Sequence, residues 1–416
     1  MVKNALYTTI QACRICGGGG FQPVIDLGEQ ALTGCFPAID EPSPPKAPLL
    51  VCRCLQCGLV QLRHSVRADL MFGENYGYRS GINSTMRNHL AGIATGAEKR
   101  AALKTGDTVL DIGCNDGTLL KAYGVEGIRR IGLDPIADIF RENYPPALEV
   151  DASLFSAATF RERCPIAKAK IITSISMFYD LEDPTSFVED IASVLDPEGL
   201  WILEQSYLPM MLDQTSFDTI CHEHLEYYAL KQIKYLAEQA ELRILDLYFN
   251  SANGGSFQIW VCHRNASYQS DTAKINETLE NERVLGLEGD EVFASFRDRV
   301  ESVREGLQNL LVKEAEAGKK IYVYGASTKG NVLLQYLALN SSTIIACADR
   351  NPIKWGRRTP GTDIPIVSED RAREDADYFL VLPWHFKEEF LAREHRFLQR
   401  GGKFIFPLPK VEVVGG

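Results

Sequence analysis

The sequence has no apolar run that approaches the ~20 residues a membrane-spanning helix needs, and its N-terminus lacks a signal-peptide pattern. It also has no long basic run, and its formal charge is -11 at pH 7. Because nucleic-acid surfaces are positively charged, this balance argues against a DNA- or RNA-binding protein, while locally basic pockets for anionic substrates stay open. We expect a soluble, cytoplasmic protein with neither a membrane nor a nucleic-acid partner.

Three common ligand-binding signatures are also missing. The turn after residues 109–112 is not the dinucleotide pattern G-x-G-x-x-G, because polar residues stand where the second glycine should be. The turn at residues 325–330 is not a P-loop, since Lys329 precedes rather than follows its glycine. The run at residues 221–228 is not H-E-x-x-H, which places two histidines on one helical face for zinc.

The chain is an ordinary globular one in size and composition. Its 416 residues correspond to about three domains of ~150 residues each. With 45% hydrophobic and 24% charged residues, it is able to bury cores of normal size. Its 11 cysteines are better explained by metal binding and buried thiols than by disulfides.

Four of these cysteines form two C-x-x-C pairs, Cys13 with Cys16 and Cys54 with Cys57, separated by a loop of 37 residues. Each pair offers two thiolates from one tight turn, so the four predict a tetrahedral, structural Zn²⁺ site. A redox pair is the alternative, and the glycine that follows each pair favours zinc. Cys52 is a possible competing ligand, and we expect Cys35 to be a buried thiol.

The stretch Val-Leu-Asp-Ile-Gly-Cys-Asn-Asp-Gly-Thr at residues 109–118 predicts a buried strand, a tight turn at Gly113 and a helix beginning near Leu119. Asp134, 21 positions after Gly113, ends a second strand, where a carboxylate can accept hydrogen bonds from ribose hydroxyls. Acidic residues at the turn would repel a pyrophosphate but can accept bonds from an amino group. The pattern resembles the D-x-G-x-x-x-G turn of class I S-adenosylmethionine (SAM) methyltransferases. An ordinary strand-turn-helix without a ligand is the alternative.

Strands at 109–112, 130–133, 171–174 and 200–204 alternate with helices, including one at 184–195 that ends in a turn at 196–199. This alternation predicts a doubly wound α/β sheet, whose ligands bind outside the carboxyl ends of the strands. The cofactor-binding candidates are therefore Asp111, Gly113, Asn115, Asp116, Asp134, Ser174 and Phe178.

Two further stretches carry candidate catalytic residues. Tyr76, Tyr78 and Ser80 lie in an aromatic loop before a helical pattern at 86–103, and could line a substrate pocket or simply pack. In Phe-Asp-Thr-Ile-Cys-His-Glu-His at 217–224, a histidine flanked by carboxylates favours a general base, because histidine titrates near working pH. A second metal site that includes Cys221 is the alternative there.

The last part of the chain predicts a second nucleotide-binding lobe. Residues 253–256, Asn-Gly-Gly-Ser, predict a hairpin before a strand at 257–261, and residues 276–316 predict a long helix or helix pair that bridges two lobes. A strand, a glycine turn and a helix follow from residue 320, with a second strand at 344–349 that ends in an acid. The helix N-terminus and Lys329 suit phosphates. The substrate-binding candidates are Ser80, His222, Asn253, Ser256, Ser327, Lys329, Asn331 and Lys354.

In this order, the motifs resemble those of the sugar C-methyltransferases that act on nucleotide-linked keto-deoxysugars in branched-sugar biosynthesis. The matching runs are C-x-x-C with C-x-x-C-G-L-V-Q-L, Y-x-Y-x-S, D-I-G-x-N-D-G, F-D-T-I-x-H-E-H, G-G-S and Y-G-A-x-x-K-G-N, and they cover nearly the whole chain. We therefore predict an α/β protein with a zinc-binding domain at 1–70, a SAM-binding class I methyltransferase domain at 71–250 and a Rossmann-like nucleotide-sugar domain at 251–416.

The resemblance implies that SAM lies at Gly113, Asn115 and Asp134, with the sugar between the middle and C-terminal lobes. It implies that His224 removes a proton beside the sugar ketone, and that the enolate attacks the methyl group, usually at C3 of a 4-keto-6-deoxysugar. Glu223 would orient or polarise the site, and Tyr76 and Tyr78 match the family's loop tyrosines.

One position departs from the family pattern. Similar members often carry a tyrosine immediately before H-E-H, where this chain has Cys221, so either Tyr78 or Tyr227 compensates or the accepted sugar differs. An O- or N-methyltransferase of a small molecule, and a non-catalytic zinc- and nucleotide-binding protein, are the alternative functions. A monomer or weak dimer is expected, and the sequence does not distinguish dTDP, GDP and CDP as the nucleotide.

Overall fold

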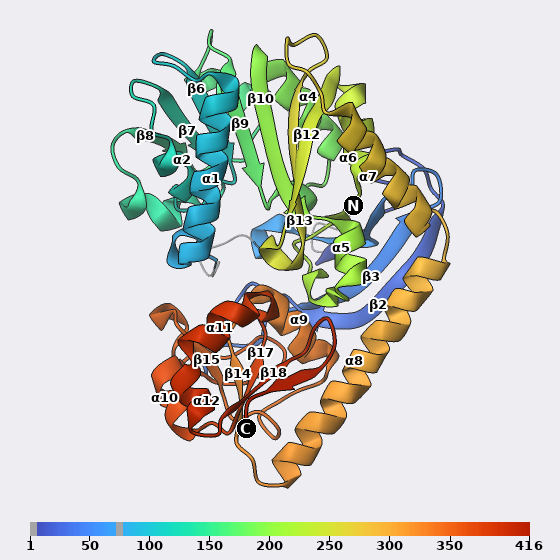
Figure 1. Cartoon of the computed structure of the whole chain (residues 1–416), viewed down its shortest axis with the longest axis vertical. Coiled ribbons are helices and arrows are strands. Elements are labelled where there is room, and N and C mark those ends of the chain that lie inside the picture. The colour runs from blue at the N-terminus through green and yellow to red at the C-terminus, as the bar shows by residue number, and fades with distance from the viewer. Residues whose placement is uncertain (1–5, 72–77) are drawn as a thin grey trace.

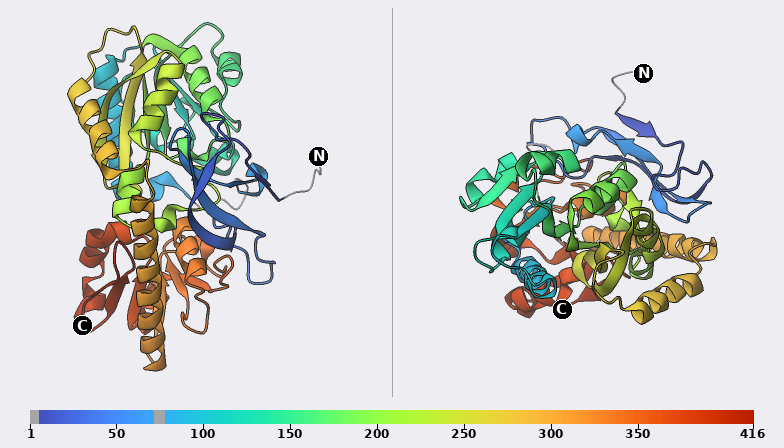
Figure 2. Two further views of the ribbon diagram at one scale, coloured as in Figure 1. Left: turned by 90° about the vertical axis from the view of Figure 1, so that its right-hand side faces the viewer. Right: turned by 90° about the horizontal axis from the view of Figure 1, so that it is seen from above.

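The computed structural model describes residues 6–71 and 78–416, and arranges them as three lobes around a long connecting helix (Figure 1). The methyltransferase-like sheet forms the upper lobe of this view, and the C-terminal sheet forms the lower lobe. The N-terminal strands lie along the junction of the two, as the side view shows (Figure 2). Among the described helices, none is long and apolar enough to cross a membrane.

The upper lobe contains a seven-stranded sheet in the order β12-β13-β10-β9-β6-β7-β8. Strands β10, β9, β6, β7 and β8 are parallel, and β13 is antiparallel to both β10 and β12. The bounds are β6 Thr108–Ile112, β7 Arg129–Leu133, β8 Leu148–Asp151, β9 Ala169–Ile175, β10 Leu195–Ser206, β12 Leu242–Asn250 and β13 Ser256–His263. The four predicted strands fall within β6, β7, β9 and β10, which confirms the predicted α/β sheet.

Helices cover both faces of this sheet. They are α1 Ser84–Ala101, α2 Thr118–Ala122, α3 Ala157–Arg163, α4 Pro184–Val194, α6 Leu230–Gln239 and α7 Thr272–Leu285. The side chains of Asn83 and Asp183 accept hydrogen bonds from backbone N–H groups in the first turns of α1 and α4, so both helices begin at capped ends. Helix α1 begins two residues before the predicted helical pattern at 86–103.

The turn predicted at 196–199 is wrong, because these residues belong to β10. Leu195 pairs with Ala169 and Leu200 with Ile171, so the intervening residues form a bulge in the strand. The physical reason is that Leu195 is buried, and pairing it with β9 continues the sheet beyond the bulge.

The predicted boundary at residue 250 divides the hairpin of β12 and β13. The loop between them contains a short 3₁₀ turn at Ala252–Gly254, and both strands belong to the upper sheet. The upper sheet therefore continues to His263.

A four-stranded antiparallel sheet, in the order β11-β4-β3-β2, forms the N-terminal lobe. Its strands are β2 Phe21–Ala31, β3 Lys46–Cys54 and β4 Val60–Leu62, joined by β11 Glu226–Tyr227 from the middle of the chain. A small separate pair, β1 Tyr7–Thr9 and β5 His64–Val66, lies beside it.

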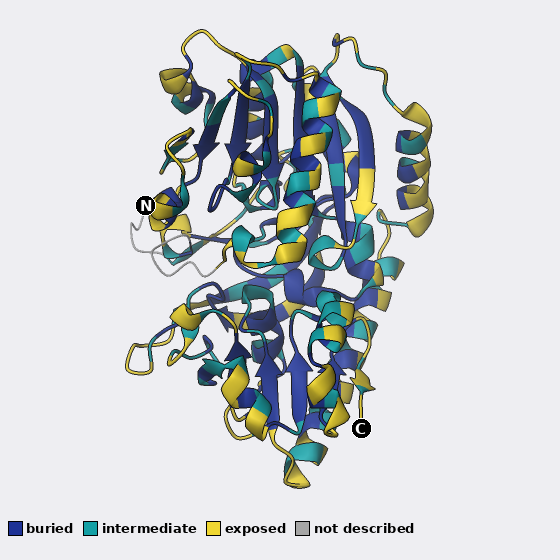
Figure 3. Ribbon diagram, turned by 60° about the vertical axis from the view of Figure 1, so that its left-hand side comes forward, coloured by how far each residue is buried: buried dark blue, intermediate teal, exposed yellow. Residues whose placement is uncertain are grey.

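The C-terminal lobe contains a six-stranded sheet in the order β16-β15-β14-β17-β18-β19, parallel except for its last pair. Its strands are β14 Ile321–Tyr324, β15 Cys347–Asp349, β16 Ile366–Ser368, β17 Tyr378–Val381, β18 Lys403–Phe406 and β19 Glu412–Val414. The helices are α9 Thr328–Tyr336, α10 Glu369–Asp375, α11 Lys387–Arg393 and α12 His395–Gln399. The central strands of both large sheets are buried and form separate cores (Figure 3).

Helix α8, Glu291–Glu316, contacts β2 of the N-terminal lobe, α5 (Leu208–Asp213) of the upper lobe and β14 of the C-terminal lobe. With α7 it forms the predicted helix pair. Its buried residues recur every three or four positions: Phe293, Phe296, Val300, Val303, Leu307 and Leu311. One helix face therefore packs against all three lobes.

We predict that Phe296→Ala destabilises the whole protein, because the ring is fully buried where the lobes meet. Removing a buried phenylalanine ring costs about 3–5 kcal/mol. Val312→Ala, at an exposed position of the same helix, is the matched control and should change stability by less than about 0.5 kcal/mol. Chemical denaturation of both variants provides the measurement, and equal stabilities would contradict the role given to α8.

Candidate active site and metal centre

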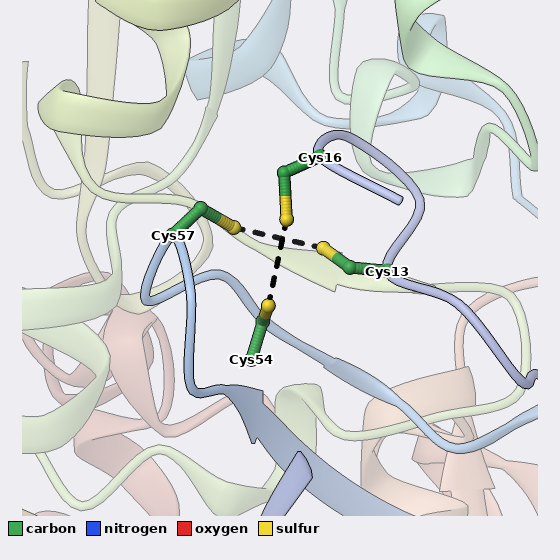
Figure 4. A group of neighbouring side chains, drawn as sticks. All are labelled: Cys13, Cys16, Cys54 and Cys57. Carbon is green, nitrogen blue, oxygen red and sulfur yellow. Dashed lines mark hydrogen bonds between the residues drawn. The ribbon is translucent and has the colours of Figure 1, made fainter. Parts of the chain in front are cut away.

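The four predicted cysteines come together as one cluster (Figure 4). Their sulfur atoms all lie within 4.8 Å of one another, with 3.6 Å separating Cys13 from Cys57 and Cys16 from Cys54. Gly17 and Gly58 follow the two pairs with φ of 70° and 77°, a conformation that glycine adopts without strain. Four thiol groups converging from two tight turns fit a tetrahedral Zn²⁺ site.

The two other N-terminal cysteines lie outside this cluster. Cys52 is on β3 and does not belong to the group of converging sulfur atoms, so it is not a competing ligand in this arrangement. The sulfur of Cys35 faces the carbonyl of Leu70 at 3.9 Å, and the residue is half-buried rather than buried as predicted.

A first cavity, of about 440 Å³, opens beyond the carboxyl ends of β6, β7 and β9. Asp111, Gly113, Asn115 and Asp134 line it, as predicted for the cofactor. Gly113 has φ of 73°, and a Cβ there would lie 3.1 Å from the Met177 side chain. Glycine is therefore required by the backbone conformation as well as by the space.

Hydrogen bonds hold the carboxylates of this cavity in place. Asp134 accepts one bond from the backbone N–H of Asn115 at 2.8 Å and another from Ile136 at 2.9 Å, one on each oxygen. Thr173 donates to Asp111 at 2.6 Å, and burial raises the pKa of Asp111 to about 7. Each oxygen of Asp134 keeps a free lone pair for a ligand hydroxyl.

Three predicted cofactor residues do not line the first cavity. Asp116 instead accepts hydrogen bonds from the backbone N–H of Gly81 and from the Arg79 side chain, both at 3.1 Å. Ser174 is buried and accepts a bond from the indole N–H of Trp201, while Phe178 is a core residue packed against that same ring.

The second cavity, of about 370 Å³, lies between the upper and C-terminal lobes. Its walls include residues from the strand ends of both sheets and from the loop before α1. The two cavities share five wall residues: Tyr78, Ser80, Met86, Ser176 and Asp180. Ligands held in the two cavities would therefore face each other across this shared wall.

The two cavities differ in charge. Six carboxylates line the first: Asp111, Asp134, Asp180, Glu182, Asp183 and Asp190. Its described wall contains no lysine or arginine, which suits the sulfonium and ammonium groups of SAM. Five basic residues line the second cavity alongside its acids: Arg79, Lys329, Arg350, Lys354 and Arg393. This second wall suits a ligand that carries phosphates.

His224 lines the second cavity in a defined orientation. Its Nδ1 lies 2.8 Å from the carbonyl oxygen of Thr219, which can only accept, so Nδ1 carries the proton and Nε2 keeps its lone pair. The ring packs on Tyr179, with centroids 4.2 Å apart. Burial, reinforced by the positive charge of Lys329, lowers the pKa of His224 to about 3. The imidazole is therefore neutral at physiological pH.

Buried acids surround this histidine. Burial raises the pKa values of Glu223, Asp180 and Asp218. Thr33 donates to Glu223 at 3.4 Å, and the Trp384 indole donates to Asp218 at 3.0 Å. One oxygen each of Asp180 and Asp218 is buried without a hydrogen-bond partner in the described structure.

Lys329 lies on the first turn of α9 and lines the second cavity. In the described part of the chain its Nζ makes one hydrogen bond, to the carbonyl of Asn253 at 2.8 Å, and no ion pair. Burial lowers its pKa, while nearby Asp218 opposes the shift. Two N–H groups of a half-buried ammonium therefore remain available to a ligand.

Among the other substrate candidates, Ser80, Asn253, Ser327 and Lys354 line the second cavity. His222, Ser256 and Asn331 do not: His222 bonds the Ala47 carbonyl at 3.0 Å, Ser256 that of Ala252 at 2.9 Å, and Asn331 that of Thr33 at 2.8 Å. All three side chains are buried, and they bond backbone carbonyls instead of lining a cavity.

Of the two tyrosines proposed to replace the one missing at Cys221, Tyr78 lines both cavities. Tyr227 lies in β11 with its hydroxyl buried, and does not reach the second cavity. Tyr76 lies outside the described residues.

Sequence reasoning missed several wall residues of the two cavities: Asp180, Asp218, His385 and Arg393. Asp180 follows β9 closely, so the rule that ligands bind at strand ends could have found it. His385 and Arg393 belong to segments far from any motif, and only the folded C-terminal lobe brings them to the cavity.

The family comparisons follow the order of the three lobes. A family model described as a methyltransferase domain matches residues 86–247, and one described as a C-methyltransferase C-terminal domain matches residues 251–409. A third, for a domain proposed to bind zinc, matches residues 13–72. The C-methyltransferase NovU of Streptomyces niveus is 30% identical over 409 residues, which cover 97% of each chain. The chain belongs to the SAM-dependent C-methyltransferase family.

Solved structures match this C-methyltransferase only in part. SAM-bound CalS10, an amino pentose methyltransferase from Micromonospora echinaspora, is 13% identical and covers 42% of this chain and 90% of its own, with a TM-score of 0.32. The plantazolicin methyltransferase BpumL, solved with SAH, is 11% identical over 44% of this chain and 87% of its own, with a TM-score of 0.36. TM-scores this low give no information about the function of this chain.

Family membership makes this chain an enzyme that methylates carbon. The O- or N-methyltransferase and the non-catalytic binding protein, both open from the sequence, are therefore set aside.

We predict that Cys54→Ser removes the metal from this C-methyltransferase and destabilises its N-terminal lobe, because a serine cannot supply the fourth thiolate. Elemental analysis for zinc and the Tm of the purified protein measure both effects. Cys35→Ser is the matched control outside the cluster, and should keep full zinc content. Full zinc occupancy in Cys54→Ser would contradict the four-cysteine site.

Proposed function

We propose that this enzyme methylates the carbon next to the ketone, at C3, of a nucleotide-linked 4-keto-6-deoxysugar through an enolate, with His224 as the base. The observation that carries the proposal is the pair of cavities that share one wall, with the neutral His224 in the second. The first cavity, lined by acids without lysine or arginine, suits the methyl donor. The second cavity, whose wall contains five lysine and arginine side chains among its acids, suits a nucleotide-sugar. The choice of C3 and of a 4-keto sugar depends on the motif resemblance.

Carbon becomes a nucleophile here only after a proton leaves it, so a base at the second cavity is the first requirement. His224 Nε2 carries a lone pair, and Nδ1–H is held by the Thr219 carbonyl, which stabilises the imidazolium that forms. The C–H electron pair moves into the C3–C4 bond, and the carbonyl pair moves onto oxygen. SAM, when bound, supplies the electrophilic methyl group that the carbon then takes.

The enolate oxygen needs a positive or hydrogen-bonding partner in the same cavity. Lys329 provides one, because its ammonium has two free N–H groups and lies close enough to His224 to lower the histidine's pKa. We therefore assign Lys329 to the enolate oxygen, in place of the phosphate role expected from the sequence.

The diphosphate would then lie toward the strand ends of the C-terminal lobe. Ser327 caps α9 by accepting a hydrogen bond from the Gly330 N–H at 3.0 Å, and residues 325–329 at this helix N-terminus line the cavity. Lys354, whose Nζ donates to the Ala326 carbonyl at 2.6 Å, and Arg350 lie in the same wall. Their charges complement a diphosphate.

The direct test incubates the enzyme with a panel of nucleotide-linked 4-keto-6-deoxysugars and labelled SAM in deuterated water. We expect deuterium to enter at C3 and a methyl group to be joined to that carbon. His224→Asn should lower both rates by about 10²–10⁴ while SAM binding, measured by calorimetry, stays unchanged.

His395→Asn, an exposed histidine of the C-terminal lobe, is the matched control and should behave as wild type. No exchange and no methyl transfer across the panel would exclude the substrate class. Wild-type rates in His224→Asn would remove the histidine from the role of base.

The pH dependence separates the two roles open to Lys329. A neutral base is required, and His224 is neutral above a pKa of about 3, so the acid limb of kcat/KM should lie far below the ordinary histidine value of ~6.5. Lys329→Met removes the neighbouring positive charge, so the acid limb should move to higher pH and kcat should fall by about 10². Lys354→Met, the control, should raise KM without moving the limb. If Lys329→Met also raised KM without moving the acid limb, Lys329 would be assigned to the phosphates instead.

A further inference from the structure

A short buried path connects the zinc centre to His224. Residues 225–227, directly after the histidine, pair with β4, which follows the second C-x-x-C turn. The backbone N–H of Leu62 donates to the carbonyl of Leu225 at 2.8 Å. On its other side, the N–H of Leu225 donates to the carbonyl of Tyr179 at 2.7 Å. The neighbour of the base is therefore held between the N-terminal lobe and the upper lobe.

Side chains connect the same strand pair to the metal cluster. Gln61, opposite Glu226 in the register, donates from Nε2 to the sulfur of Cys13 at 3.2 Å. Its Oε1 accepts from the backbone N–H of Arg14 at 3.3 Å. Arg14 stands between two of the zinc ligands, so its backbone position depends on the metal turn.

The Arg14 side chain reaches into the strand pair. Its Nη1 donates to the Leu62 carbonyl at 2.8 Å and its Nη2 to Ser65 Oγ at 2.7 Å. Its Nε lies 3.4 Å from Glu226 Oε1 and 3.6 Å from Oε2 of Glu182, which lines the first cavity, and the side chains of Arg14 and Glu226 are 2% and 0% exposed. Burial raises the pKa of Glu226, and the positive charge of Arg14 opposes that shift. A fully buried ion pair gives little net stability, because desolvation offsets the attraction. Stability alone therefore does not explain this pair.

The role of the Arg14–Glu226 pair is instead to fix the position of β11. Strand β11 has only two residues, and a pairing this short does not hold its own register against a slip. A slip of one residue would turn the side chains of the segment to the opposite face. A charge contact to a fixed Arg14 pins Glu226 in place and, through residue 225, pins His224.

We propose that Arg14 and Glu226 are positioning residues through which the zinc centre sets the orientation of His224. The inference rests on the proposed function for the assignment of His224 as the base. Loss of the metal would release Arg14 and misplace the base. Glu226 does not line the methyl-donor cavity, whereas Arg14 also contacts Glu182 in its wall.

The test uses the zinc-loaded full chain and the variants Glu226→Gln and Arg14→Met/Glu226→Leu. The first removes the charge at constant shape, and the second replaces the pair with apolar side chains of similar volume. In both variants we expect zinc content and Tm to stay near wild type, while kcat and the rate of C3–H exchange fall at least tenfold. SAM affinity should stay near wild type in Glu226→Gln, which leaves the contact of Arg14 with Glu182 in place. Arg14→Lys, which keeps a positive charge at this position, should lose less exchange than the double variant.

Arg53→Met is the matched control, because Arg53 lies in the same lobe and pairs with Asp290 at 3.0 Å but makes no side-chain hydrogen bond or ion pair to β11 in the described part of the chain. It should keep wild-type exchange. Wild-type exchange rates in both Glu226→Gln and the double variant would overturn the proposal. If the double variant loses zinc or unfolds, the exchange rate of the isosteric Glu226→Gln alone decides between the two outcomes. Absence of exchange in the wild-type enzyme would instead overturn the proposed function.

Discussion

Two backbone hydrogen bonds at Leu225 constrain the rest of the site. One joins the residue to the loop after β9 of the methyltransferase sheet, and the other joins it to β4 beside the zinc turns. His224 therefore lies where the N-terminal and upper lobes meet, and it faces a cavity whose opposite wall belongs to the C-terminal lobe. Under the proposed function, three lobes are needed because a carbon acid must meet its base, its methyl donor and a binding site for its nucleotide at one place.

The upper and C-terminal lobes contain the same kind of turn. In the upper lobe, Asp134 at the end of β7 accepts the Asn115 N–H of the turn after β6 at 2.8 Å. In the C-terminal lobe, Asp349 at the end of β15 accepts the Ala326 N–H of the turn after β14, also at 2.8 Å. Lys354 approaches that second acid at 3.9 Å. Lysine and arginine side chains in the wall, rather than the fold, distinguish the second cavity from the first.

The periodic and local features of this chain were predictable. The strands at the methyl-donor turn, the helix pair ending in α8 and the C-x-x-C pairs depend on neighbouring residues, and the structure confirms them. Predictions failed where packing overrode local chemistry. The Asp-Pro-Glu-Gly stretch at 196–199 has the composition of a turn, yet it forms a bulge because β10 continues on both sides.

The sequence by itself determined which residue types were available: a glycine turn with an acid 21 positions later, four paired cysteines, and a histidine among carboxylates. Only the tertiary structure decided which of them face a ligand. Ser174 and Phe178 are adjacent to the strand end but turn into the core, whereas Ser176 and Asp180 turn into both cavities. The pairing of β11 with β4 was likewise invisible in the sequence, because it joins segments far apart along the chain. Orientation at a strand end depends on what packs beneath it, and that is a property of the folded chain.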